Sequence, residues 1–271
     1  MPSTGSSHTV AAVSFLNARP LIDGLGDQLD IEMVTAVPSR LLALLLADSA
    51  DLALCPVIDY QTSPQELCVV PVGGIGSDGP THTVRVFSRT PLDEVECIHT
   101  DGDSRTSVAL LQVVLAARYG RVPEIRPLAG WSSRGDVRPD AILLIGDKVV
   151  HVDERAERYP CQLDLGAAWK ELTGLPFVFA TWLARRGCDL GELPAALVRC
   201  RERNRLRIPE IVAGQANGWP RELATRYLQS VLRYEIGPRE LESMELFWSR
   251  CRNLGLLEEL RPLRVYDSNC L

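Results

Sequence analysis

The chain has 271 residues, of which 46% are hydrophobic and 24% charged, a composition typical of a globular protein that buries a sizeable core. Its formal net charge of −6 and its scattered basic residues argue against a nucleic-acid partner. The longest apolar run, Leu41 to Ala47, is too short to cross a bilayer, and residues 1–7 lack the basic and apolar regions of a signal peptide. We therefore expect a cytoplasmic protein with no membrane partner.

Short apolar segments rich in β-branched residues alternate with helical patterns through the first two thirds of the chain. This alternation predicts an α/β fold with mostly parallel sheets. We expect strands, in chain order, at residues 8–15, 31–36, 52–55, 83–88, 96–100, 141–145 and 176–184. Helices are expected between them at 38–47, 106–119 and 165–173, and then, in a purely helical C-terminal region, at 193–205, 208–216, 221–231 and 239–254.

The sequence contains no flexible linker, although its length suits two domains. We therefore expect the strands at 83–88 and 176–184 to cross between two lobes. Residues 87–181 would form an inserted lobe, and residues 1–86 with 182–271 would form the other. A cleft between the lobes is then the expected place for a small-molecule site.

The eight cysteines and four histidines indicate neither disulfides nor a metal site. No cysteines form a C-x-x-C pair, and no histidines have the H-x-x-x-H or H-E-x-x-H spacing. Because a chain of this size does not need disulfides to fold, we expect reduced thiols. We also expect no bound metal.

Asn17 is the first candidate for a functional residue. It follows the first predicted strand, and residues at the carboxyl end of a parallel strand face the crevice in which α/β folds bind ligands. The alternative is that Asn17 forms an Asx turn before a helix that begins at Pro20.

The loop before the predicted strand at 83–88 combines glycines with hydroxyl side chains. Ser77, Gly79 and Thr83 belong to this loop, which could present backbone N–H groups to an anion. The alternative is an ordinary Asp-Gly-Pro turn. His82 lies in the same segment, but we assign it no role.

A second candidate anion site lies at the start of the predicted helix 106–119. Ser104, Arg105, Thr106 and Ser107 gather hydroxyls, a cation and unpaired N–H groups there, and this arrangement suits a carboxylate. The alternative is plain N-capping by Asp103, Ser104 or Thr106, which would satisfy the same donors within the chain.

Two further acidic positions follow predicted strands or open helices. Gly146 and Asp147 end a buried strand, and Asp147 could either face the cleft or pair with Lys148. Asp164 looks first like the N-cap of the helix at 165–173.

Five segments in order carry a resemblance to a known family. They are Ser14-Phe15-Leu16-Asn17 with Pro20-Leu21, Ser77-Asp78-Gly79-Pro80, residues 104–111, residues 143–147, and residues 164–180. They resemble the family that chorismate dehydratase of the futalosine route to menaquinone shares with dihydroxynaphthoate synthase. The resemblance implies a fold like that of type 2 periplasmic binding proteins, with two α/β lobes that close on a ligand. It also implies a lyase that needs no cofactor.

The chain departs from the family pattern in two places. Cys55-Pro56-Val57 stands where a serine-rich turn is common, and Thr81-His82-Thr83 stands where Val-x-Ser is frequent. The opening segment, Leu16 to Pro20, favours the dehydratase over the synthase. The alternatives are a synthase-like enzyme of the same pathway and a non-catalytic module that binds a small dicarboxylate.

The resemblance implies that chorismate loses its C3 proton and C4 hydroxyl to give 3-[(1-carboxyvinyl)oxy]benzoate. The motif segments contain no evident base, so we hypothesise that the substrate's own enolpyruvyl carboxylate takes the proton while Asn17 orients the substrate. Asp147 is the reserve candidate for the base, should it reach the cleft unpaired.

Overall fold

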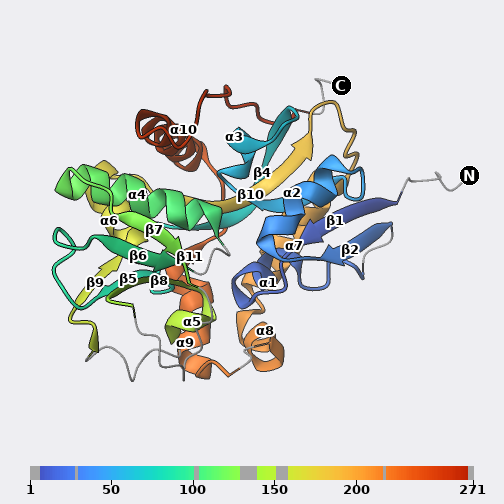
Figure 1. Ribbon diagram of the computed structural model, residues 1–271. Helices are drawn as coiled ribbons and strands as arrows, with labels where there is room; N and C mark the ends of the chain where they lie inside the picture. Colours follow the sequence, from blue (N-terminus) through green and yellow to red (C-terminus); the bar gives the residue numbers. More distant parts are fainter. Residues whose placement is uncertain are drawn as a thin grey trace, which may run out of the picture.

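Two β-sheets, each flanked by helices, form two lobes side by side (Figure 1). The computed structural model describes residues 7–27, 30–100, 104–128, 139–150, 158–215 and 218–267. Asp103, one of the predicted capping residues, lies outside these ranges.

The first sheet has six strands in the order β11-β4-β10-β3-β1-β2. Their bounds are Leu232–Arg233, Leu67–Ser77, Phe177–Arg185, Leu52–Pro56, His8–Ala12 and Ile31–Thr35. The second sheet has five strands in the order β7-β6-β8-β5-β9. Their bounds are Glu124–Pro127, Cys97–Thr100, Ala141–Ile145, Val84–Ser88 and Cys161–Asp164.

The α/β class is as predicted, but the expectation of mostly parallel sheets is wrong. β10 runs antiparallel to both β3 and β4, and β5 runs antiparallel to both β8 and β9. Each of these strands enters its sheet from the other lobe, so the right-handed helical crossover that joins parallel neighbours does not set its direction. The other strands of each lobe, apart from β11, are parallel to one another, as in β1 with β2 and β6 with β7.

The chain changes sheet twice. Strand β4 belongs to the first sheet and β5 to the second, so the first passage lies in residues 78–83. The second passage lies in residues 165–176, between β9 and β10. The division of the chain at 86/87 and 181/182 stays a prediction, and the strand pairing places both changes of sheet several residues earlier.

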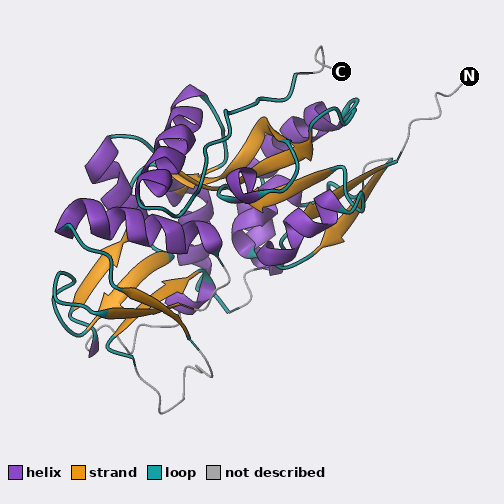
Figure 2. Cartoon of the chain, turned by 45° about the horizontal axis from the view of Figure 1, so that its top comes forward, coloured by secondary structure: helices purple, strands orange, loops and turns teal. Residues whose placement is uncertain are grey.

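Helices cover the two sheets and build the C-terminal region (Figure 2). Their bounds are α1 Arg19–Ile22, α2 Pro38–Leu46, α3 Asp59–Thr62, α4 Arg105–Tyr119, α5 Asp147–Val150, α6 Leu165–Thr173, α7 Leu193–Arg205, α8 Ile208–Gln215, α9 Arg221–Arg226 and α10 Pro238–Asn253. The helix expected at 221–231 changes after α9 into a π-helical turn, Tyr227–Val231.

Capping residues set the ends of the two helices that pack against the second sheet. The Ser104 side chain accepts a hydrogen bond from the Ser107 N–H at the start of α4, and Asp164 accepts one from Ala167 at the start of α6. Both helices end at a glycine with positive φ, Gly120 and Gly174, which suits the left-handed C-cap.

Strand β4 approaches β10 so closely that only glycine fits at two positions. A Cβ atom at Gly74 would lie 2.7 Å from the Ala180 carbonyl oxygen, and one at Gly76 would lie 2.6 Å from that of Phe177. Strand propensities do not predict β4, because it contains these glycines and Pro71, and both residue types are depleted in strands.

An aromatic cluster joins the two lobes. Phe177 of β10 packs edge-on against Trp169 of α6, with ring centroids 5.3 Å apart, and against Phe247 of α10, with centroids 5.0 Å apart. All three side chains are buried, so this contact ties the second passage between the sheets to the C-terminal helix.

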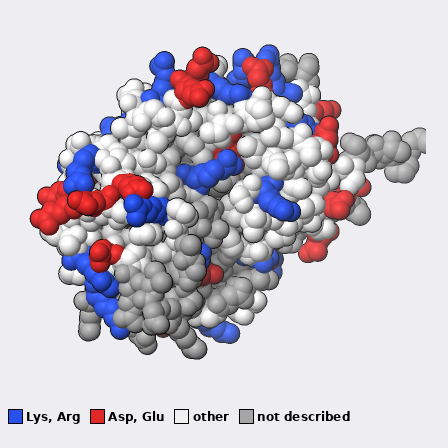
Figure 3. All heavy atoms as spheres, viewed as in Figure 1, with Lys and Arg blue, Asp and Glu red and all other residues white. Residues whose placement is uncertain are grey.

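The surface shows no broad area of one charge on the face drawn in Figure 3, where basic and acidic side chains are interspersed. Within the described part of the chain, no helix combines the length and the apolar character that crossing a membrane requires.

Candidate functional site

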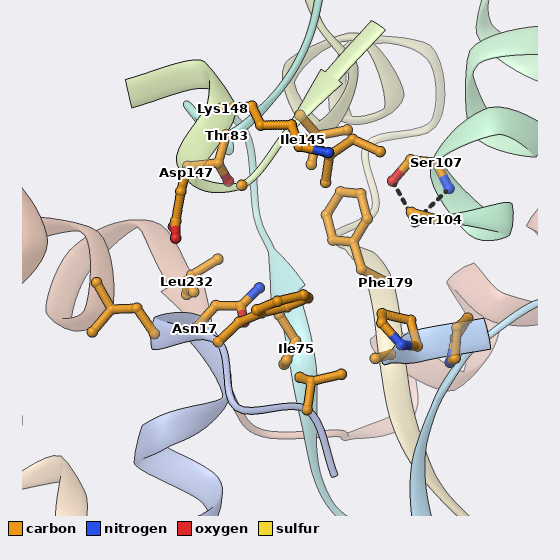
Figure 4. A pocket seen from close by; sticks show the side chains of 18 of the residues that line it. Asn17, Ile75, Thr83, Ser104, Ser107, Ile145, Asp147, Lys148, Phe179 and Leu232 are labelled. Carbon is orange, nitrogen blue, oxygen red and sulfur yellow. Dashed lines mark hydrogen bonds between the residues drawn. The ribbon is translucent and has the colours of Figure 1, made fainter. Parts of the chain in front are cut away.

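A cavity of about 260 Å³ lies between the two lobes (Figure 4). Its wall combines residues from the first sheet, the second sheet with the start of α4, and the C-terminal helices. Its polar side chains are those of Asn17, Thr83, Ser104, Ser107, Asp147, Lys148, Trp219 and Tyr227. The sequence therefore predicted five of these eight polar residues as site residues, and a sixth, Lys148, only as a possible partner of Asp147.

Asn17 lies in a one-turn 3-10 helix, Leu16–Ala18, that follows β1. Its Oδ1 atom is buried and has no hydrogen-bond partner among the described residues. The Asx turn considered above needs this oxygen to accept a backbone N–H, so that alternative is wrong. A buried carbonyl oxygen without a partner is costly, and a donor brought by a ligand would satisfy it.

Thr83 and Tyr227 meet at the junction between the second sheet and the C-terminal helices. The two hydroxyl oxygens lie 2.9 Å apart, and both side chains are buried. Burial raises the pKa of the Tyr227 phenol to about 12, and hydrogen bonds with Thr83 and Asn17 partly oppose this rise. The phenol is therefore protonated at neutral pH.

Trp219 closes the cavity beside Tyr227. The two rings are stacked with centroids 5.0 Å apart, and the Trp219 Nε1–H donates to Asp147 Oδ1 at 2.9 Å. Asp147 thus lines the cavity as predicted, but one of its carboxylate oxygens accepts from the indole. This bond weakens its case as the reserve base.

Gly146 also lines the cavity, and its backbone holds the Asp147 segment against Thr83. The Gly146 N–H donates to the Thr83 carbonyl oxygen at 2.8 Å. Gly146 has a φ of 65°, a conformation that residues with a side chain rarely adopt.

Ser104 and Ser107 line the opposite side of the cavity (Figure 4). The Ser104 hydroxyl donates to Ser107 Oγ at 2.9 Å and accepts from the Ser107 N–H at 3.3 Å. N-capping by Ser104 is therefore confirmed. The two hydroxyls also stand at the helix N-terminus, where backbone N–H groups favour a negative charge.

Ser77 and Gly79 do not reach the cavity lining. The Ser77 hydroxyl donates to the Gly79 carbonyl oxygen at 3.1 Å. Two backbone N–H groups of this loop, those of Thr81 and His82, bond to the carboxylate of Asp164 at 2.8–3.1 Å. The anion held by this loop is thus the protein's own carboxylate.

Arg105 and Thr106 also lie outside the cavity lining. Arg105 pairs with the buried Asp59, with Nη2 and Oδ1 2.9 Å apart, and Thr106 Oγ1 accepts from the Ile58 N–H at 3.3 Å. Burial raises the pKa of Asp59 to about 6, and the Arg105 charge opposes this shift. Ligand contacts by Ser77, Gly79, Arg105 and Thr106 stay untested predictions, and this placement does not support them.

The rest of the wall is apolar and offers a surface for a flat ring. Phe15, Ile75, Phe179 and Leu232 belong to it. Sequence reasoning missed Trp219 and Tyr227 as site residues because they lie far from the five motifs along the chain. A Gly-Trp-Pro turn was the only local signal for Trp219.

Residues 8–253 match a protein family whose description is menaquinone biosynthesis. The chain belongs to this family. Among curated proteins, a chorismate dehydratase of Thermus thermophilus is 30% identical to this chain over 165 residues. The match spans 56% of this chain and 60% of the Thermus protein.

Three solved structures of low sequence identity share its fold. Protein AF1704 of Archaeoglobus fulgidus has a TM-score of 0.68 at 15% identity, over 92% of this chain and 98% of that one. The Candida albicans CA3427 gene product, described as having the generic periplasmic binding protein fold, has a TM-score of 0.65 at 12% identity, over 95% and 92%. The aliphatic sulphonate binding protein SsuA of Escherichia coli has 0.63 at 16%, over 94% and 95%. The predicted periplasmic-binding-protein-like fold is therefore confirmed.

Proposed function

We propose that this protein is a chorismate dehydratase that converts chorismate to 3-[(1-carboxyvinyl)oxy]benzoate in the futalosine route to menaquinone. One observation carries the proposal. Polar residues from three of the five motifs, together with Thr83, meet at a single cavity between the lobes, in a chain similar to a named chorismate dehydratase. A non-catalytic dicarboxylate binder would share the fold but not the turnover.

The cavity offers a complementary group for each part of the substrate. Chorismate is a dianion at neutral pH, and one of its carboxylates would meet Ser104 and Ser107 at the start of α4. Its ring would lie against Ile75 and Phe179. Its C4 hydroxyl is the one hydrogen-bond donor of the dianion. The Asn17 Oδ1 atom has no donor among the described residues, so it would accept from this hydroxyl.

The elimination proceeds in two steps. In the first, the C3–H bond breaks, the enolpyruvyl carboxylate takes the proton, and the electron pair moves into a dienolate that ends on the ring carboxylate. In the second, the C4–O bond breaks as the ring becomes aromatic, and the leaving hydroxide takes the same proton and departs as water. Because the base belongs to the bound substrate, it acts at a high effective molarity.

The protein's own groups in the cavity are poorly suited to be the base. The Tyr227 phenol has its pKa raised to about 12, so it holds its proton at neutral pH. One carboxylate oxygen of Asp147 is already engaged as the acceptor of the Trp219 indole N–H. The role left to the protein is to hold the substrate and to place donors where negative charge develops.

The cytoplasm is the proposed compartment. Each cysteine within the described ranges is a free thiol, as a reducing environment would maintain.

Purified protein mixed with chorismate tests the proposal. Ultraviolet absorbance and mass spectrometry should show an aromatic product lighter than chorismate by one water, and Asn17→Ala should lose most of this activity. Tight binding of chorismate without any product would identify a binding module instead. An absence of both, with the protein folded by circular dichroism, would reject chorismate as the ligand.

A further inference from the structure

Lys148 brings a positive charge to the cavity wall. It is the one lysine or arginine among the described residues that line the cavity, and its neighbour Asp147 is the one carboxylate among them. The Asp147 Oδ1 atom accepts from the Trp219 indole at 2.9 Å, so this carboxylate belongs to the wall itself. Without Lys148, the charged side chains of the described lining would consist of a single carboxylate, which would repel a dianionic ligand.

The Lys148 side chain enters the cavity from the second lobe. Lys148 lies in the short helix α5, which follows strand β8 of the second sheet. Figure 4 shows its side chain running toward the side of the cavity that Ser104 and Ser107 occupy, whereas Asn17 lies on the opposite side. A cation and two hydroxyls at a helix N-terminus therefore face one end of the cavity, and an amide faces the other.

Chorismate has a matching arrangement of groups around its ring. The ring carboxylate at C1 and the hydroxyl at C4 are para to each other, and the enolpyruvyl ether at C3 is next to the hydroxyl. If the C4 hydroxyl meets Asn17 Oδ1, as proposed above, the ring carboxylate points to the opposite end of the cavity. That end is the one toward which Lys148 extends.

We infer that the Lys148 ammonium group pairs with the ring carboxylate of chorismate and not with the enolpyruvyl carboxylate. The two pairings have opposite effects on the reaction. At the ring carboxylate, the cation stabilises the negative charge that moves there as the C3 proton leaves. At the enolpyruvyl carboxylate, it would lower the basicity of the group that takes this proton. The inference rests on the proposed function, because it assigns the cation to one part of chorismate.

NMR of labelled lysine tests the contact directly, because Lys148 and Lys170 are the two lysines of the chain. Lys170 pairs with Asp78 at 2.5 Å and lies outside the cavity lining, so its signal is an internal control. We would label lysine with ¹³C and assign the two Cε signals from the loss of one in Lys148→Met or in Lys170→Arg. The wild-type protein would then be titrated with benzoate, which carries an aromatic carboxylate alone, and with its neutral analogue benzamide.

Benzoate should shift the Lys148 signal and leave the Lys170 signal in place, and benzamide should shift neither, because only benzoate offers a charge to the ammonium group. A Lys148 signal that benzoate does not move, or that benzamide moves equally far, would overturn the inference.

Kinetics of Lys148→Met tests which carboxylate the cation holds. We expect the chorismate Kd to rise about tenfold and kcat to fall about 10–100-fold, since the charge on the ring carboxylate grows toward the transition state. Arg126→Met is the matched control and should match the wild type. Arg126 is an exposed cation of the same sheet, lies 2.6 Å from Glu124 and is outside the cavity lining. Weaker binding by Lys148→Met with an unchanged or raised kcat would indicate the enolpyruvyl carboxylate and overturn the inference.

The two experiments separate this inference from the proposed function. If the wild type does not turn over chorismate, the proposed function fails, while the benzoate titration still shows whether Lys148 holds an aromatic carboxylate. If chorismate is turned over and benzoate leaves the Lys148 signal in place, the proposed function stands and the inference fails. The titration uses the wild-type protein, so its result does not depend on the folding of Lys148→Met.

Discussion

Arg105 at the start of α4 forms an ion pair with Asp59 at the start of α3, with Nη2 and Oδ1 2.9 Å apart. The pair connects the helix that covers the second sheet to the first lobe. Asp59 is fully buried, whereas about half of the Arg105 side chain is exposed. The neighbouring bond from Ile58 N–H to Thr106 Oγ1 crosses the same boundary, so residues 58 and 59 hold residues 105 and 106 in place.

Asp59 should make the protein less stable as the pH rises. Its pKa is raised from 3.8 to about 6 in the fold, so between these values the folded state holds a proton that the unfolded state has lost. Relative to Asp59→Asn, the free energy of unfolding should fall by about 3 kcal/mol from about pH 4 to above pH 6. Urea unfolding across this range measures the difference, and parallel pH profiles for the two proteins would contradict it.

Thr106→Val should lower stability and leave chorismate affinity unchanged. The substitution keeps the side-chain shape but leaves the buried Ile58 N–H without an acceptor, which costs about 1–3 kcal/mol. Ser107→Ala is the comparison, because Ser107 lines the cavity and its loss should weaken binding. Thermal unfolding and ligand titration on both variants distinguish a structural role from a ligand-binding role. Weaker chorismate binding by Thr106→Val would show that Thr106 contributes to the binding site.

Asn17→Ala should lose about 100-fold in kcat with a much smaller change in Kd, since its hydrogen bond matters most as the hydroxyl departs. Steady-state kinetics combined with calorimetric titration measures the two effects separately. Equal losses in binding and in kcat/KM, at unchanged kcat, would show that Asn17 merely binds the substrate.

Trp219→Phe should weaken chorismate binding by about 5–10-fold. The phenyl ring keeps the stack on Tyr227 but removes the donor to Asp147, and an unpaired carboxylate repels the dianionic substrate. The effect should shrink at high salt, because screening weakens this repulsion. A salt-independent loss would instead point to altered packing of the ring.

Much of the architecture follows from local sequence pattern. The helix at 165–173 has the predicted bounds and the predicted Asp164 cap, because its apolar spacing and capping signals agree. Strand β4 was not predicted because its glycines are required by contact with β10, a partner more than 100 residues away along the chain. The antiparallel direction of β10 likewise depends on strands that are distant in sequence, so the local pattern does not predict it.

The sequence predicted site residues only where a motif itself forms part of the cavity wall. Ser104 and Ser107 are three residues apart and share a face of α4, whereas Thr106 lies on another face and turns toward Ile58. Tyr227 and Trp219 reach the cavity from the C-terminal region, and no local pattern indicates that they lie beside Thr83 and Asp147.

The most direct test of the account is a single-turnover reaction with chorismate carrying deuterium at C3. The account predicts an aromatic product that lacks one water and the label, formed more slowly than from unlabelled chorismate if removal of the C3 proton limits the rate. Wild-type protein that is folded and yet leaves labelled and unlabelled chorismate unchanged would contradict the account at its centre.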